Sequence, residues 1–317
     1  MGHVLYRATV ALATPLGTPL AGDTLFGQAC WALRAAQGEA ELTRRLDGYL
    51  RGRPWVVFSD GFPAGHLPKP VLPQHFEPVT EPVARKAAKR RRWIPAHYAG
   101  SPLAVMLQHA VGDAGAYGAA PVRTVQAHNT LDRLTGSTGK GDFAPYSTPQ
   151  TFHAAGQRID FLISIDEERA SAEEISGLLA AIGAGGFGRD ASTGLGKFIV
   201  EGVSAAAAAA HRNAAAFWTL APCAPQGQGF DAAKSYWRVL TRFGRHGAAH
   251  ALGANPFKTP VLLAAAGAVF APVGGFSLQT FIGKGFGGDG RLSKTERATV
   301  HQGYAPVLPL AFEETRA

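Results

Sequence analysis

The sequence predicts an α+β protein whose elements follow the order β-α-β-β-α-β in its first half. Three observations indicate this class. Alternating apolar residues, typical of strands, occur at 4–13 and again at 157–166. Each of these segments is followed by apolar residues at helical spacing. The stretch between them, 60–155, holds 11 of the 21 prolines, which indicates a long insertion with loops and a hairpin rather than core.

The first elements follow from local patterns. Residues 4–13 (VLYRATVALA) alternate well enough to form a strand. A helix is expected to start at Gly22-Asp23-Thr24, with Asp23 as its N-cap residue. Gly38 is expected to end that helix. Residues 55–58 (WVVF) form a short apolar run that predicts a buried strand before the insertion.

The pattern resumes after the insertion. Residues 157–166 (QRIDFLISID) predict a strand, and Ser171-Ala-Glu-Glu174 has the form of a capping box that starts a helix. A glycine-rich segment at 183–196 separates this helix from a strand at 197–200. Residues 1–203 therefore predict a ferredoxin-like (RRM-like) domain, interrupted by the insertion at about 60–155.

The second half, 204–317, is less regular. It begins with serine and alanines and then has a strand pattern at 214–221 (AAAFWTLA). A helix is expected at 231–243 (DAAKSYWRVLTRF), followed by a strand at 260–270. Shorter strands are expected near 276–282 and 299–302. This order predicts a second, degraded ferredoxin-like domain.

Composition narrows the class of protein. The net charge of +8 and the pI near 9.7 favour a polyanionic partner, either nucleic acid or an anionic membrane surface. Six positive charges and no negative one fall within 85–92, where a solvated helix face, a phosphate contact and an acidic protein partner all remain open. Two cysteines, no long apolar run and no secretory pattern at the N-terminus predict a cytosolic protein outside the membrane.

Motifs for catalysis or cofactor binding are weak. Residues 183–188 match G-x-G-x-x-G, but a helix precedes them and a strand follows, which is the reverse of a dinucleotide site. Residues 136–141 (GSTGKG) lack the glycine position and the Ser or Thr of a P-loop. The sequence has no HExxH, GxSxG or CxxC motif. We therefore expect no cofactor and no metal.

A metal-independent ribonuclease would need a histidine within reach of the scissile ribose. The first helix, 22–37, contains none. His66, His128 and His301 remain candidates, but no second group is paired with them in the sequence. The sequence predicts that the chain is not an enzyme.

The glycine-rich run GAGGFGRDASTGLGKF, 183–198, is the strongest candidate for a binding site. Its six glycines allow the backbone to approach a ligand closely and to present N–H groups. Arg189, Ser192, Thr193 and Lys197 add donors suited to phosphates or ribose hydroxyls. A tightly turned connection is the alternative interpretation.

Five stretches, in this order, resemble the fourth subunit of the Csm effector complex, a RAMP-superfamily protein of type III-A CRISPR. They span nearly the whole chain, and each one alone is weakly specific. The stretches are Gly22–Gly27, Phe58–Pro63 with Leu67–Pro70, Asn129–Gly136, Gly186–Phe198 and Gly303–Pro309.

The resemblance implies two ferredoxin-like domains with a thumb-like insertion in the first. It also implies a non-catalytic role in which the subunit binds the 5′ repeat-derived handle of the crRNA and docks the large signalling subunit and the backbone subunits. Three alternatives stay open: a RAMP endoribonuclease that processes CRISPR RNA, a purely structural adaptor, and the equivalent subunit of the type III-B Cmr complex.

The resemblance assigns handle binding to the glycine-rich loop and guide contact to 128–140. Our hypothesis is that the loop amides hold handle phosphates together with Arg189 and Lys197, while the insertion lies at the boundary between handle and guide. The residues expected to contact RNA are Gly186, Gly188, Arg189, Ser192, Thr193, Gly194, Gly196, Lys197, His128, Arg133 and Lys140.

Overall fold

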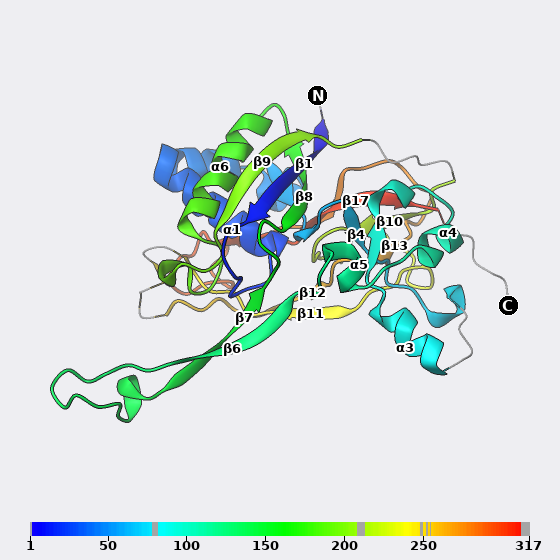
Figure 1. Cartoon of the computed structure of the whole chain (residues 1–317). Coiled ribbons are helices and arrows are strands. Elements are labelled where there is room, and N and C mark those ends of the chain that lie inside the picture. The colour runs from blue at the N-terminus through cyan, green and yellow to red at the C-terminus, as the bar shows by residue number, and fades with distance from the viewer. Residues whose placement is uncertain are drawn as a thin grey trace.

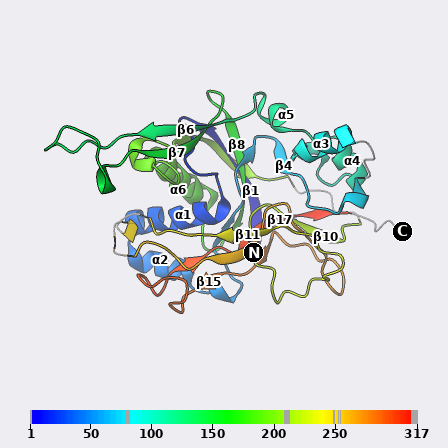
Figure 2. The ribbon, with the colours of Figure 1, turned by 90° about the horizontal axis from the view of Figure 1, so that it is seen from below.

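A computed structural model of the chain describes residues 2–77, 82–207, 213–247, 250–251, 253 and 255–311. Helices and strands are mixed, as expected for an α+β protein, and a long β-hairpin projects from the body (Figure 1). Figure 2, the view from below, shows the same hairpin extending to one side. None of the described helices has the length and apolar content needed to cross a bilayer.

The first sheet is antiparallel and has the strand order β2-β8-β1-β9. Along the chain its elements follow the predicted order β-α-β-β-α-β, with the insertion between the second and third strands. The helices α1 and α6 cover one face, where alternating residues of β1 and β8 form the core (Figure 1). The elements are β1 (His3–Leu12), α1 (Gly22–Gln37), α2 (Glu39–Leu46), β2 (Val56–Phe58), β8 (Arg158–Asp166), α6 (Ala172–Gly185) and β9 (Phe198–Ala205).

The start of α1 differs from the expectation. Asp23 is not the N-cap residue, because the helix already begins at Gly22 with Ala21 before it. The Asp60 carboxylate accepts the N–H of Gly22 at 2.8 Å and so satisfies a donor at the helix start from a distant part of the chain. A Cβ on Gly22 would lie 2.3 Å from the Phe58 carbonyl oxygen, so the helix can start here only with glycine.

The other predicted caps are present. Gly38 follows α1 with φ +88°, and its N–H donates to the Arg34 carbonyl, which confirms the expected stop. Ser171 accepts the Glu174 N–H at 3.1 Å, as in a capping box. The Glu174 carboxylate binds the Arg45 guanidinium, which links α6 to α2.

The second sheet is antiparallel with the order β13-β10-β17-β14. Its central strand β17 is buried at every position, and the sequence patterns did not predict it because it carries Pro306 and Pro309. A proline carbonyl can still accept, and Pro306 accepts the N–H of Leu220 at 2.9 Å. The strands are β10 (Ala216–Thr219), β13 (Val269–Phe270), β14 (Phe281–Gly283) and β17 (Tyr304–Leu310).

The predicted helix at 231–243 is wrong. Asp231 instead forms a turn, with its carboxylate accepting the Ala233 N–H at 2.9 Å, and the chain after it is extended. Tyr236 exchanges backbone hydrogen bonds with Val269, and β11 (Val239–Arg242) pairs with β12 (Val261–Ala264). Pairing with residues distant in sequence has overridden the local helical pattern.

The predicted strand at 260–270 is two strands, β12 and β13, separated by a turn. No α-helix follows α6 in the part of the chain that the structure describes. The second ferredoxin-like domain is therefore not confirmed, and the division at 203 stays a prediction. Two short strands, β15 (Phe286–Gly287) and β16 (Val300–His301), pair with each other near the end of the chain.

The insertion contributes to the core, contrary to the sequence-based expectation. Leu67, Ile94 and Met106 are buried against Trp218 and Leu308 of the second sheet. The short elements of the insertion carry too few residues for a period to be visible in the sequence. The insertion as a whole contains β3 (Phe62–Pro63), β4 (His66–Pro68), α3 (Pro82–Arg90), β5 (Trp93–Pro95), α4 (Leu103–Gln108), α5 (Asp113–Tyr117), β6 (Val122–His128) and β7 (Tyr146–Phe152).

Candidate nucleic-acid interface

The glycine-rich loop between α6 and β9 has a defined backbone conformation. Gly186, Gly188, Gly194 and Gly196 all have positive φ values, between +73° and +100°. A Cβ on Gly196 would lie 2.2 Å from the Phe187 carbonyl oxygen. These glycines are therefore required by the turn itself, in addition to any role in ligand approach.

Many N–H groups of the loop are used inside the protein. The amide of Arg189 donates to the Thr18 hydroxyl at 2.9 Å, and that of Lys197 donates to the Thr14 hydroxyl at 2.8 Å. The Gly196 amide donates to the Pro15 carbonyl at 2.8 Å. Within the described chain, the loop amides left without an acceptor are those of Gly188, Asp190, Ala191 and Ser192.

Two of the predicted phosphate donors also have internal partners. The Arg189 guanidinium donates to the Asp190 carboxylate at 3.1 Å and to the Pro149 carbonyl on β7. The Thr193 hydroxyl donates to the Asp190 carbonyl at 2.9 Å. The Lys197 ammonium and the Ser192 hydroxyl are exposed and have no partner among the described residues. They are the loop side chains with donors available to a ligand.

The β6–β7 hairpin carries the other predicted residues. His128 stacks on Tyr146, with ring centroids 5.0 Å apart, and contacts the Thr148 hydroxyl at 3.0 Å. Arg133 and Lys140 lie in the connection between the two strands and are exposed. Large apolar side chains are exposed along the hairpin, an arrangement typical of a binding surface. They are Val122, Val125, Leu131, Leu134, Phe143, Tyr146 and Phe152.

The structure brings the loop to the base of the hairpin. The Arg189 contact with Pro149 joins the loop to β7, and Leu16 pairs with Thr151 beside it. The connection between β6 and β7, in contrast, forms the far end of the projecting hairpin (Figure 1), and Arg133 and Lys140 belong to this connection. The predicted residues therefore form two regions, one at the loop and one on the hairpin.

A buried charged cluster lies behind the Gly22-Asp23-Thr24 motif. The Asp23 side chain is fully buried and accepts a hydrogen bond from Arg242 Nε at 2.6 Å, and His301 Nε2 lies 3.3 Å away. Burial alone would raise the pKa of Asp23, but the His301 and Arg242 interactions outweigh it and hold the pKa below its ordinary value. Because Arg242 and His301 come from the second half, this motif joins the two halves of the chain.

Asp60 lies near this cluster, but the influences on its pKa add up to a rise instead of a fall. Burial and the nearby Asp23 charge raise the pKa of Asp60 to about 7, although the Gly22 N–H acts in the opposite direction. Asp60 also donates its own N–H to the Leu220 carbonyl.

Among the described residues, no group of three or more His, Cys, Asp or Glu side chains is placed to hold a metal ion.

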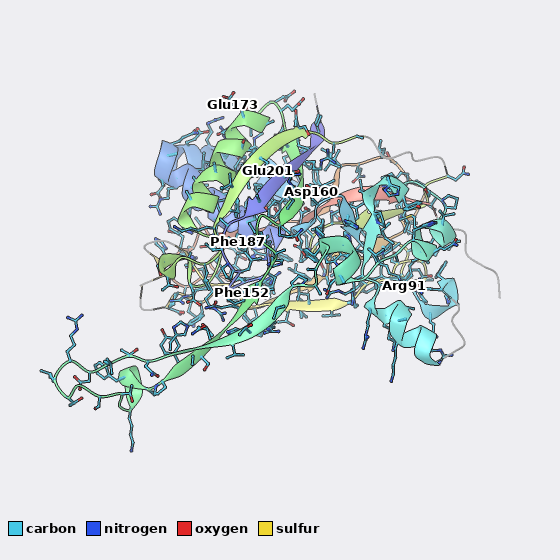
Figure 3. The ribbon with its side chains drawn as sticks, in the orientation of Figure 1. Arg91, Phe152, Asp160, Glu173, Phe187 and Glu201 are labelled. Atoms are coloured by element: carbon cyan, nitrogen blue, oxygen red, sulfur yellow. The ribbon has the colours of Figure 1, made fainter. Side chains whose placement is uncertain are left out.

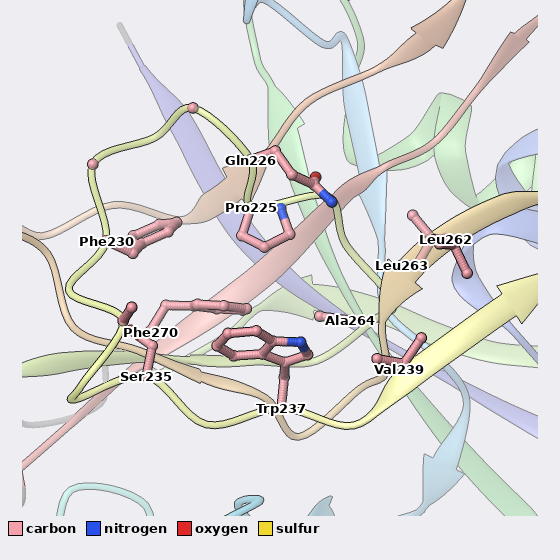
Figure 4. A pocket seen from close by; sticks show the side chains of 13 residues that line it. Pro225, Gln226, Phe230, Ser235, Trp237, Val239, Leu262, Leu263, Ala264 and Phe270 are labelled. Atoms are coloured by element: carbon pink, nitrogen blue, oxygen red, sulfur yellow. The ribbon is translucent and has the colours of Figure 1, made fainter.

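An apolar groove of about 430 Å³ was not predicted from the sequence, because part of its wall lies in the segment expected to be helical. Figure 4 shows Trp237 and Phe230 beside Phe270, with Val239 and Leu262 on the facing strands. Trp237 is 45% exposed as a residue, and its ring stacks on Phe270 with ring centroids 5.8 Å apart. Such an exposed ring could stack on a flat group such as a nucleobase.

Comparisons with known proteins give a clear result for the fold alone. No protein-family model matches the sequence, and no curated protein matches it. A solved structure of the "Csm1-Csm4 cassette in complex with cA4" matches with a TM-score of 0.60 at 16% identity, over 98% of this chain and 99% of that one. The same cassette with pppApA matches with a TM-score of 0.59, also at 16% identity, over 98% and 99%.

A second type of assembly decides which subunit is matched. The "Csm3-Csm4 subcomplex in the type III-A CRISPR-Cas interference complex" matches with a TM-score of 0.58 at 12% identity, over 96% of this chain and 99% of that one. Csm4 is the subunit named in both assemblies. The chain has the fold of Csm4. The Csm4 fold agrees with the resemblance found in the sequence motifs, and the match extends almost from end to end.

Proposed function

We propose that the chain is the non-catalytic subunit of a type III-A CRISPR-Cas (Csm) antiviral complex that binds and caps the 5′ handle of the crRNA. In this role it docks the large signalling subunit and the backbone subunits. The observation that supports the proposal best is the nearly end-to-end match to the subunit shared by the Csm1-Csm4 and Csm3-Csm4 assemblies.

The loop supports handle binding by its chemistry. The Lys197 ammonium and the free amides of Gly188, Asp190, Ala191 and Ser192 are donors for the phosphates of a single strand. Arg189 and Thr193 shape the loop through their internal hydrogen bonds. A loop held in one conformation loses less conformational entropy on binding than a flexible one.

The hairpin supports the contact at the boundary between handle and guide. Single-stranded RNA is recognised through splayed bases that stack on side chains, and each stacked base contributes about 1–3 kcal/mol. Leu134 is 97% exposed at the end of the hairpin, and Tyr146 is 52% exposed on β7. Trp237 in the apolar groove is a third candidate for stacking.

The test is to purify the chain co-expressed with its genomic neighbours, extract the RNA and sequence the RNA ends. We expect a discrete RNA with one common 5′ end. Lys197→Ala should reduce RNA retention, and Lys294→Ala, which removes an exposed lysine elsewhere, should not. For a single strand, losing one phosphate contact lowers the slope of log affinity against log salt by about 0.7.

Two outcomes would overturn the proposal. If the purified complex contains no RNA, or RNA with scattered 5′ ends, the chain does not cap a handle. If the chain alone cuts repeat RNA in the presence of a chelator, it is a RAMP endoribonuclease and the non-catalytic assignment is wrong.

A further inference from the structure

The basic segment 85–92 has no place in the proposed handle site. It forms the end of α3 and the residues after it, and α3 lies at the opposite end of the molecule from the tip of the β6–β7 hairpin in both views (Figures 1 and 2). We propose that this segment is a second RNA-binding surface, which contacts the phosphate backbone without reading its sequence.

The cations of α3 share one side of the helix. At about 100° per residue, Arg85, Lys86, Lys89 and Arg90 fall within an arc of about 140°. All four are exposed, whereas Ala88, on the other side of the helix, is only 7% exposed. The helix therefore packs on the protein through Ala88 and presents its charges to solvent. Figure 3 shows long side chains that project from α3 away from the body.

The ion-pair pattern separates two kinds of cation in this segment. The Arg92 guanidinium is held by two hydrogen bonds to the Asp113 carboxylate, at 2.6 and 2.7 Å. Trp93 Nε1 donates to the same carboxylate at 2.7 Å, so this end of the segment is anchored. In the described residues, no ion pair or side-chain hydrogen bond reaches the charged groups of Lys86, Lys89, Arg90 or Arg91.

The spacing of these positive charges destabilises α3 when no anionic ligand is bound. Arg85 with Lys89, and Lys86 with Arg90, are like-charge pairs at spacing i,i+4, and such pairs destabilise a helix. The positive charges of Lys89 and Arg90 near the C-terminus interact favourably with the helix dipole, which offsets part of this repulsion. A polyanion lying along the charged arc would relieve the remaining repulsion and release its own counterions.

The surroundings favour RNA over an acidic protein as the partner. Protein interfaces are built around apolar and aromatic anchors and are depleted in lysine. No large apolar side chain is exposed between residues 85 and 121, all of which the structure describes. Phosphate contacts need only positive charge within reach. A surface of exposed lysines and arginines without apolar anchors fits a nucleic-acid backbone.

The experiment compares the full-length chain with the triple variant K86Q, K89Q and R90Q. Glutamine removes the charge and remains a good helix former. The control is the triple variant R51Q, R53Q and R291Q, which removes the same charge from exposed positions elsewhere. Circular dichroism verifies that all three proteins have the same helix content. Binding to a fluorescent poly(U) strand is measured between about 50 and 200 mM salt.

We expect the α3 variant to lose about 2 from the slope of log affinity against log salt, since each of three phosphate contacts contributes about 0.7. Over this fourfold rise in salt, its affinity should therefore fall about 20-fold less than that of the wild type. The control should keep the wild-type slope. Poly(U) carries no repeat handle, so this result is independent of whether the loop at 186–198 caps a handle.

Three results would overturn the inference. The α3 variant could keep the wild-type slope, or the control could lose as much slope as the variant. Alternatively, the α3 variant could bind poly(U) normally but fail to assemble with its co-expressed neighbours after ribonuclease treatment. That last result would identify the partner of α3 as an acidic protein.

Discussion

Replacing Asp60 by asparagine should change how the stability of the fold depends on pH. The pKa of Asp60 is about 7 in the folded protein, against an ordinary value of 3.8. The folded state thus holds a proton on this carboxyl group over a pH range in which the unfolded chain has already released it. The stability that this proton contributes is fully present below about pH 4 and is lost as the pH rises through about 7.

The magnitude follows from the size of the shift. The rise of the Asp60 pKa from 3.8 to about 7 corresponds to at most about 4 kcal/mol of stability. Asparagine stays neutral at every pH, and its side-chain oxygen can accept the Gly22 N–H as the carboxylate does. The quantity to compare is the free energy of unfolding of Asp60→Asn minus that of the wild type. We expect this difference to be more favourable to the variant at about pH 8 than at about pH 4, by up to about 4 kcal/mol.

Urea unfolding followed by tryptophan fluorescence measures this difference, because Trp55 and Trp218 are fully buried in the two main cores. Groups that titrate equally in both proteins cancel when the two curves are subtracted. Asp47→Asn is the matched control, since the ion pairs of Asp47 with Arg51 and Arg53 lie on the surface, where such a pair contributes at most about 1 kcal/mol. A flat difference curve for Asp60→Asn would refute the assignment of a raised pKa to this group.

Two further predictions concern the junction and the loop. Arg242→Ala should lower the free energy of unfolding by about 3–5 kcal/mol, because it leaves the buried Asp23 carboxylate without its guanidinium partner. Urea unfolding measures this loss. The double variant Arg242→Ala with Asp23→Asn should recover part of it, because the buried carboxylate charge is then removed. Gly196→Ala should destabilise the fold by more than 1 kcal/mol, because φ is +73° and the new Cβ would lie 2.2 Å from the Phe187 carbonyl oxygen. Gly177→Ala, in the middle of α6 with open space around it, should instead raise the melting temperature, and equal effects of the two glycine variants would contradict the role given to the loop backbone.

The sequence by itself determined the main strands and helices of the first sheet. Periods of two and of about 3.6 residues, together with Gly38 and Ser171 at the helix ends, predict β1, α1, β8 and α6 closely. These signals are local, since each depends on residues within a few positions of one another. The glycine-rich loop was recognised for the same reason, because a run of glycines is visible without any knowledge of the fold.

Only the tertiary structure decided the conformation of the second half and the partners of the charged side chains, because the contacts that determine them join residues far apart in the sequence. The segment 231–243 has a helical pattern but is extended, since its backbone pairs with 261–270. Asp23 lies inside α1 rather than at its N-cap, where its carboxylate accepts a hydrogen bond from Arg242 and lies 3.3 Å from His301 Nε2, both of the second half. Arg189 is directed to the Pro149 carbonyl of the hairpin, which leaves Lys197 as the free cation of the described loop. Long-range pairing and burial assign these partners, and residue type alone does not encode them.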